Sequence, residues 1–120
     1  MKLTESVIKI KSRAFAIRII KLYQFLQNEK KEYVMSKQVL RSGTSIGANV
    51  HEAFFGASKK DFTNKLSIAL KEACETEYWL DILAETNYID VSMKNSILAD
   101  CQALCKLLHA SVKTAKASNN

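Results

Sequence analysis

Apolar residues recur at three- and four-residue steps along most of the chain, and no proline interrupts them. This spacing is typical of amphipathic α-helices, and short polar segments divide it into four stretches. Residues suited to helix N-caps precede the last three stretches: Ser36, Ser58 with Asp61 three positions later, and either Asp90 or Ser92. The pattern predicts helices over residues 4–28, 36–56, 59–86 and 92–113, and a frayed tail over 114–120.

Four helices of about 20–25 residues with short connections form an antiparallel up-and-down bundle, because a short connection places consecutive helices side by side. At 120 residues the chain has the size of one domain. It contains no repeat of fixed period and no linker long enough to divide it. We therefore expect an all-α fold, a four-helix bundle in a single domain over residues 1–120.

Two interior glycines, Gly43 and Gly47, lie between apolar positions of the second predicted helix. A glycine costs a helix interior about 0.5–1 kcal/mol relative to alanine, so close tertiary packing must offset both. A phosphate-binding loop is the alternative, but such a loop ends in Gly-Lys-Ser/Thr, whereas Ala48 and Asn49 follow Gly47. We expect the two glycines to let another helix approach closely, and Gly56 to mark the end of their helix.

The first and third predicted helices carry more apolar residues than one core-facing stripe needs. The core stripe of the first helix comprises Ile8, Phe15, Ile19, Leu22 and Leu26. Its second stripe comprises Ile10, Ala14, Ile17 and Phe25. The third helix has a second face on which isoleucines and a tryptophan mix with glutamates, a composition typical of subunit contacts. We therefore predict a homo-oligomer whose interface includes Ile10, Ile17, Ile68, Glu75, Trp79 and Ile82.

The net charge of +6 comes from the first half of the chain. Residues 1–60 contain 12 Lys or Arg against 4 Asp or Glu, whereas residues 61–120 contain 6 against 8. A basic half attracts polyanions, either nucleic acid or an anionic membrane surface, although a solvated charged face is the simpler interpretation. No aromatic-rich motif accompanies the charges, so contact with the backbone of RNA or DNA is the expectation. The cations assigned to it are Lys2, Lys9, Lys11, Arg13, Arg18 and Arg41.

The sequence also bears on the compartment of the protein. No apolar run reaches the roughly 18 residues of a membrane span, and the first residues lack the pattern of a signal peptide. Three cysteines without a CxxC spacing do not make a disulfide framework and suit a reducing compartment. We expect a cytoplasmic protein with no membrane partner.

Candidate metal chemistry rests on the cysteines. Cys101, Cys105 and His109 recur at four-residue steps, and Cys74 would complete a set of four zinc ligands. Against a zinc site, Cys101 and Cys105 fall in the middle of the apolar stripe of the last predicted helix. The Glu-x-x-His spacing of di-iron bundles is absent from the sequence. We therefore predict core cysteines, and neither a metal nor a cofactor.

A second polar cluster joins His51 and Glu52 to Glu72, Glu75 and Glu77 of the third predicted helix. An acid–base pair is conceivable there, but no nucleophile or oxyanion donor accompanies it. We predict structural ion pairs, with Arg41 or lysines as partners, and no enzymatic activity.

Four segments resemble a known family. They are residues 40–49 (LRSGTSIGAN), 58–62 (SKKDF), 65–73 (KLSIALKEA) and 75–80 (ETEYWL). This ordered set closely resembles the four helix bundle protein family, which includes proteins encoded within intervening sequences of bacterial large-subunit ribosomal RNA genes. The resemblance implies a four-helix bundle that assembles into a ring-like homopentamer. It also implies a distant likeness to the accessory protein of diversity-generating retroelements, which binds nucleic acid and a reverse transcriptase.

These observations lead to a functional expectation. The protein is predicted to be a non-catalytic homo-oligomer, with a pentamer favoured, that binds RNA or DNA or acts as a scaffold. The alternative is a protein–protein assembly module with no nucleic-acid role. Salt-dependent binding of RNA separates the two hypotheses.

Overall fold

A computed structural model describes residues 3–56 and 58–118, with side chains from Ser6 onward. Its four helices are α1 (Leu3–Asn28), α2 (Met35–Ala53), α3 (Lys59–Glu85) and α4 (Val91–Ser118). The described residues include no strand, so the predicted all-α four-helix bundle is confirmed. No helix in the described part is long and apolar enough to cross a membrane.

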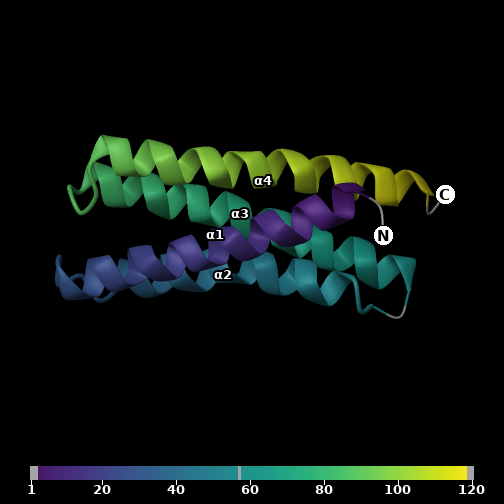
Figure 1. Ribbon diagram of the computed structural model, residues 1–120, viewed down its shortest axis with the longest axis horizontal. Coiled ribbons are helices and arrows are strands. Elements are labelled where there is room, and N and C mark those ends of the chain that lie inside the picture. Colours follow the sequence, from purple (N-terminus) through teal and green to yellow (C-terminus); the bar gives the residue numbers. More distant parts are fainter. Residues whose placement is uncertain (1–2, 57, 119–120) are drawn as a thin grey trace.

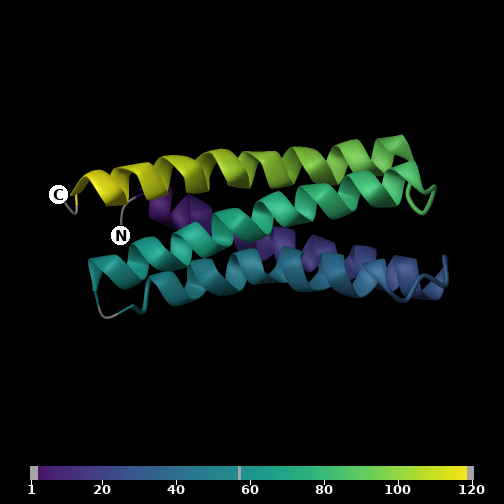
Figure 2. The ribbon, with the colours of Figure 1, turned by 180° about the vertical axis from the view of Figure 1, so that it is seen from behind.

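The helices form an elongated bundle that measures 48 × 21 × 20 Å. Each helix packs along its neighbours in sequence, and α1 also contacts α4, less extensively. The diagonal pairs, α1 with α3 and α2 with α4, are not in contact. Figure 1 shows α1 in front, and the reverse view in Figure 2 shows α3 in front. The outer faces of α1 and α3 therefore lie on opposite sides of the molecule.

Two helix ends differ from the predicted bounds. The second helix ends at Ala53 rather than at residue 56, and Gly56 has no positive φ, so it is not a left-handed helix stop. The last helix continues to Ser118 rather than ending at residue 113. Residues 113–118 contain no glycine or proline, and alanine and lysine are good helix formers, so nothing in that segment ends the helix.

The core lies along the axis of the bundle. The predicted core stripe of α1, from Ile8 to Leu26, is buried throughout. Leu80 and Leu83 of α3 and Leu104 and Leu108 of α4 are buried with it. Phe25, which the sequence placed on an outward stripe, is instead half-buried against this core. The spacing of apolar residues thus predicts the core face of α1 correctly, with Phe25 as the exception.

The glycines of α2 lie where α1 comes closest. A Cβ atom added to Gly43 would lie 2.7 Å from both Cγ1 and Cγ2 of Ile19. A Cβ atom added to Gly47 would lie 3.1 Å from the carbonyl oxygen of Ser12. Gly47 therefore admits the backbone of α1, and Gly43 admits one of its buried side chains. These contacts explain why glycine occupies both positions, although glycine weakens an isolated helix.

The sequence suggested Ser36 as the N-cap of α2, but the residue that caps this helix is Glu32. The carboxylate of Glu32 accepts hydrogen bonds from the backbone N–H groups of Val34, Met35 and Ser36, at 2.9, 2.9 and 2.7 Å. Ser36 lies inside the helix, and its hydroxyl donates to the Glu32 carbonyl. Among the other predicted caps, Ser58 accepts from the Asp61 N–H, and Asp90 accepts from the Met93 N–H. The carboxylate satisfies several helix N–H groups at once, which one hydroxyl cannot do.

The cap makes a prediction for stability. Burial alone would raise the pKa of Glu32, but the three backbone hydrogen bonds outweigh it and hold the pKa below its ordinary value of 4.5. A carboxyl with a lowered pKa in the folded state stabilises the fold above pH 4.5, and this contribution is lost as the pH falls through the folded-state pKa. Glu32→Gln should therefore lower the free energy of unfolding at pH 7 by about 1–2 kcal/mol.

Urea melts at pH 7 and at about pH 3 test this prediction. The difference between the wild-type protein and Glu32→Gln should shrink as the pH is lowered from 4.5 through the folded-state pKa of the carboxyl. The matched control is Glu29→Gln, which removes the same charge from an exposed residue three positions earlier. A Glu32→Gln protein as stable as the control at pH 7 would show that the cap contributes nothing.

Candidate functional site

The six cations predicted to bind nucleic acid lie in different surroundings. Lys2 lies outside the described residues. Arg18 donates to Asp100 of α4 at 2.6 Å, and also to the side chain and carbonyl of Ser96. Its charge is therefore largely matched within the chain, and it joins α1 to α4. Sequence reasoning missed this pairing, because Arg18 and Asp100 are 82 positions apart.

Arg41 is likewise engaged, in the predicted ion-pair cluster. Its guanidinium pairs with Glu72 at 2.9 Å and with Glu75, and so joins α2 to α3. Trp79 donates its ring N–H to the same Glu75 carboxylate at 3.0 Å. The hydrogen bonds from Trp79 and Arg41 lower the pKa of Glu75. The perturbed carboxyl thus has a structural cause, and nothing in the cluster marks it as an acid or base for catalysis.

The rest of that predicted cluster is divided between two places. Glu52 pairs with Lys65 at 3.6 Å, which adds a second ion pair between α2 and α3. The ring of His51 lies against the ring of Phe55 at a tilt of 49°, with ring centroids 5.0 Å apart. Glu77 lies away from both, on the side of α3 that faces α4, where its partner is Cys105. The structure therefore does not assemble these residues into one site.

The remaining predicted cations lie on the first half of α1. Lys11 and Arg13 are exposed, and no acidic residue in the described part lies within ion-pair distance of either. Lys9 is half-buried, and its ammonium group lies 4.3 Å from the centroid of the Phe54 ring. Lys11 and Arg13 are thus the predicted cations best placed to meet a polyanion.

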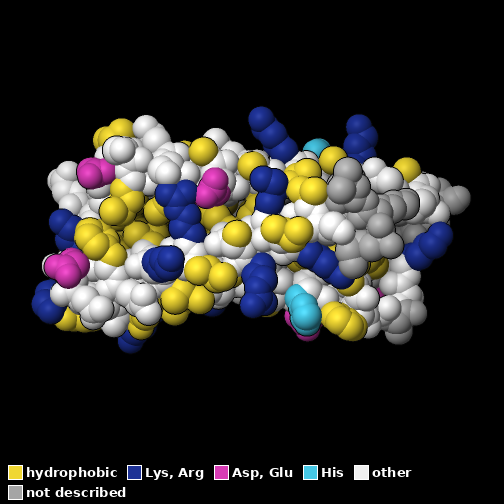
Figure 3. All heavy atoms as spheres, viewed as in Figure 1, with side chains coloured by type: hydrophobic (Ala, Val, Ile, Leu, Met, Phe, Trp, Pro, Cys, Tyr) yellow, Lys and Arg dark blue, Asp and Glu magenta, His cyan; other side chains and the backbone are white. Residues whose placement is uncertain are grey.

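The fold gathers further cations beside them. We define the basic end as residues 6–15, 45–56, 58–72 and 105–118, which lie at the end of the bundle that carries both termini (Figure 1). This end contains ten Lys or Arg and three Asp or Glu, whereas the rest of the described chain from Ala16 onward contains seven and eight. On the face seen in Figure 3, Lys and Arg occur along the whole length, whereas Asp and Glu lie mainly in the left half, away from the basic end. The bundle is therefore a rod with a charge of +7 at one end.

Three separate segments, residues 6–15, 58–72 and 105–118, supply the cations, which is why the sequence did not reveal the cluster. The members that sequence reasoning missed are on α3 and α4, and all but the half-buried Lys65 are exposed: Lys59, Lys60, Lys65, Lys71, Lys106, Lys113 and Lys116. Their common position follows from the antiparallel arrangement, which places the start of α3 and the last turns of α4 at the same end.

An exposed aromatic side chain accompanies the basic end. Phe55 is 74% exposed, just beyond α2. It lines an open depression of about 430 Å³, and the other lining residues are His51, Glu52, Gly56, Asp61 and Lys65. Exposed aromatic rings among cations are the usual platform for stacking single-stranded bases. This platform is a single aromatic residue that lies beside charged residues of another helix. For that reason it does not appear in the sequence as an aromatic-rich motif.

The predicted interface residues occupy the outer faces of α1 and α3. On α1, Ile10 and Ile17 are exposed together with Ile20, and Ile10 is 68% exposed. On α3, Ile68 and Tyr78 are exposed, whereas Trp79 and Ile82 are half-buried. Steps of three, four and seven residues place each set on one side of its helix. Each outer face is therefore an apolar strip on a charged molecule.

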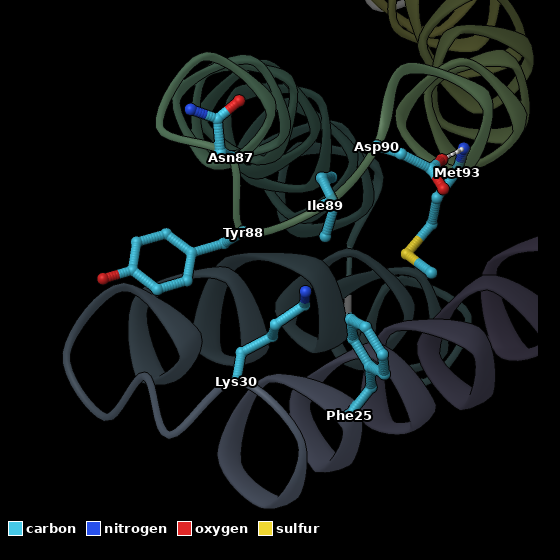
Figure 4. Close-up of a pocket in the computed structure, with 7 residues that line it drawn as sticks. All are labelled: Phe25, Lys30, Asn87, Tyr88, Ile89, Asp90 and Met93. Carbon is cyan, nitrogen blue, oxygen red and sulfur yellow. Dashed lines mark hydrogen bonds between the residues drawn. The ribbon is translucent and has the colours of Figure 1, made fainter.

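A pocket of about 220 Å³ lies at the opposite end, where the α1–α2 and α3–α4 turns approach each other. Figure 4 shows Phe25 and Lys30 facing Tyr88, Ile89 and Met93 across it. The carboxylate of Asp90 points away to cap α4 (Figure 4). The residues that line the pocket include no nucleophile paired with a base. The pocket supports no catalytic proposal.

The cysteines lie between α3 and α4. Cys101 is buried and donates to the Ala73 carbonyl at 3.4 Å, and Cys105 donates to Glu77 Oε1 at 3.4 Å. The hydrogen bond with Cys105, followed by burial, raises the pKa of Cys101. The same hydrogen bond lowers the pKa of Cys105, which therefore ionises before Cys101. His109, the third member of the predicted series, is exposed and lies outside this group.

The described residues thus define a class of protein: a four-helix bundle whose ion pairs and caps are structural, with an exposed basic end and two apolar outer faces. The chain belongs to the family of 23S rRNA-intervening sequence proteins, whose model matches residues 4–110. This match indicates no catalytic family, and it agrees with the resemblance seen in the sequence.

A solved structure supports the same assignment. It is the crystal structure of a protein with unknown function from the S23 ribosomal protein family of Bacteroides thetaiotaomicron VPI-5482. That protein is 56% identical to this chain, and the match covers 92% of this chain and 99% of the other. The TM-score is 0.91, so the two bundles have the same fold. Among curated proteins, none matches the chain.

Proposed function

We propose that the protein is a non-catalytic, ring-forming homo-oligomer that binds RNA or DNA through the basic ends of its subunits. The observation that carries the proposal is the uneven distribution of charge along the bundle: ten cations and only three acidic residues lie at one end. The family assignment is consistent with this role but does not specify it.

The assembly is argued from the two apolar outer faces. The outer face of α1 and that of α3 are different surfaces on opposite sides of the bundle. If α1 of one copy packs on α3 of the next, the contact is heterologous, and repeating it closes a ring when the rotation permits. A contact between two identical faces would instead stop at a dimer. Five copies is the number that the family resemblance implies.

A ring of this kind has a consequence for the charges. Cyclic symmetry about an axis along the bundles points all subunits in the same direction, so all basic ends lie on one rim. One nucleic-acid strand then contacts several subunits, and the later contacts form at a high effective concentration. The exposed cations and Phe55 supply backbone contacts and a stacking platform, which require no particular base sequence.

Two point variants test the assembly. Ile17→Asp places a charge in the outer face of α1, and Ile68→Asp does so in the outer face of α3. Each variant alone should be a monomer of 13.5 kDa by light scattering, because each lacks one of the two faces that a ring needs. Mixed in equal amounts, they should form a dimer, because Ile68→Asp retains an intact α1 face and Ile17→Asp an intact α3 face.

The control for these variants is Val91→Asp, which introduces the same charge at an exposed apolar residue at the start of α4. It should assemble as the wild-type chain does. A mixture that stays monomeric would contradict the α1-to-α3 contact, and a monomeric wild-type protein at micromolar concentration would contradict the ring. In both cases the basic end remains testable, since nucleic-acid binding by single chains is a separate measurement.

A further inference from the structure

We infer that Cys101, Cys105 and Glu77, with Cys74 as the fourth donor, form a binding site for one Zn²⁺ ion between α3 and α4. The Sγ atoms of the two cysteines and a carboxylate oxygen of Glu77 all lie within 4.8 Å of one another. The Cys105 Sγ and the Glu77 Oε1 are 3.4 Å apart. The sequence analysis weighed a zinc set that included His109 and rejected it in favour of core cysteines, whereas the fold places Glu77 beside the two cysteines.

These separations suit tetrahedral zinc. With Zn–S bonds of about 2.3 Å and a Zn–O bond of about 2.0 Å, neighbouring ligand atoms of a tetrahedron are about 3.5–3.8 Å apart. The Cys105–Glu77 separation already meets this value. The Cys101 Sγ lies within 4.8 Å of the other two ligand atoms, so it needs to approach each of them by only about 1 Å, which small side-chain rotations supply.

The two helices provide the ligands in pairs. Cys101 and Cys105 are four residues apart on α4, and Cys74 and Glu77 are three residues apart on α3, so each pair lies on one side of its helix. Facing helices of bundles build metal sites from such i, i+3 and i, i+4 pairs. Cys74 is exposed, which gives an ion a route from solvent to the buried Cys101.

The surroundings of Glu77 favour a cation over a simple core role for the cysteines. Glu77 is half-buried, and it takes part in none of the salt bridges of the described residues. Its hydrogen-bond partner is the weak S–H donor of Cys105. A half-buried carboxylate normally has a cationic partner or strong donors. Zinc would supply that positive charge, and thiolates are the ligands that select it over Mg²⁺ or Ca²⁺.

The test uses the untagged, reduced chain after treatment with a chelator. Co²⁺ titration should produce the visible absorption of tetrahedral thiolate coordination, with saturation at one ion per chain, and Zn²⁺ should displace it. Zn²⁺ at about a hundredfold excess over its Kd should raise the melting temperature by about 5–10 °C. Absence of the thiolate absorption or of saturation would overturn the site.

Variants identify the ligands. Cys105→Ser and Glu77→Gln should each weaken Zn²⁺ binding more than about 100-fold, since even outer contacts of a metal site change affinity by 10–100-fold. Glu77→Gln keeps the shape of a partly exposed side chain, so it remains informative if Cys105→Ser folds poorly. Cys74→Ser should change the Co²⁺ spectrum, and an unchanged spectrum would remove Cys74 from the site.

Two controls complete the experiment. His109→Ala removes the histidine four residues after Cys105, and Glu85→Gln removes an exposed carboxylate from α3. Neither should alter the Zn²⁺ affinity. An equal loss in His109→Ala and Glu77→Gln would overturn the assignment, because it would show that ions bind through scattered surface groups.

Discussion

Gly43→Leu is expected to lower the free energy of unfolding by about 1–3 kcal/mol or more. Even a Cβ atom at this position would lie 2.7 Å from two carbons of Ile19, which is itself fully buried. A leucine would have to displace α1 or force Ile19 out of its rotamer, and overpacking of this kind usually costs about 1–3 kcal/mol. The better helix propensity of leucine returns less than about 1 kcal/mol. Urea melts at fixed protein concentration measure the difference.

The matched control is Ala48→Leu, which introduces the same side chain at an exposed position of the same helix. It should change stability by less than about 0.5 kcal/mol. A double-mutant cycle locates the cause: Gly43→Ala should cost at least about 1 kcal/mol less in an Ile19→Ala background, because the two clashing carbons are then absent. Additive effects would show that Gly43 is not held against Ile19.

The second large effect concerns nucleic-acid binding. Lys59→Glu with Lys60→Glu should weaken binding of a labelled single-stranded RNA at least about tenfold at 50 mM salt, because each subunit of a ring loses two cations and gains two like charges. Glutamates at the first positions of α3 are compatible with the helix dipole, so the fold should be retained. In the wild-type protein, affinity should fall by about 10³-fold or more between 50 and 200 mM salt if six or more phosphates are contacted.

The control pair is Lys30→Glu with Lys37→Glu. It makes the same change of charge at two exposed lysines at the opposite end of the bundle. Fluorescence anisotropy should show a change of about twofold or less for this pair, since net charge alone steers association without forming contacts. Equal losses for both pairs would mean that only net charge matters. If the wild-type protein binds neither RNA nor DNA at low salt, the alternative of a protein assembly module takes the place of the nucleic-acid proposal.

Local features of this fold could be read from the sequence. The apolar period placed the four helices and identified the buried face of α1, because an amphipathic helix has to turn its apolar side inward wherever its partner lies. Ser58 was recognised as a cap, and Asp90 was one of the two candidates for the last helix, since a cap interacts with residues two or three positions away. Glu32 was missed as the cap of α2, because its side chain acts from beyond the usual N-cap position through an irregular turn that includes Lys31 at a φ of 54°.

Features that join distant segments needed the tertiary structure. Arg18 read as a free cation, yet Asp100 pairs with it. Arg41 was expected either to contact nucleic acid or to pair with glutamates of the third helix, and the structure shows the pairs with Glu72 and Glu75. Such pairs depend on the crossing angles and relative positions of the helices, which the residues of one helix do not encode. The same reason explains why His109 was grouped with the cysteines, whereas Glu77 of the facing helix is their actual neighbour.

The sequence by itself determined that this protein is a four-helix bundle with close packing at Gly43 and Gly47, since period, caps and glycine spacing are local properties. Only the tertiary structure decided where the charges and ligands meet. Lysines from the starts of α1 and α3 and the end of α4 share one end of the bundle because alternate helices run in opposite directions. Cys105 and Glu77 meet because α4 packs along α3 in one particular register, and that register is set by the α3–α4 turn and by core packing.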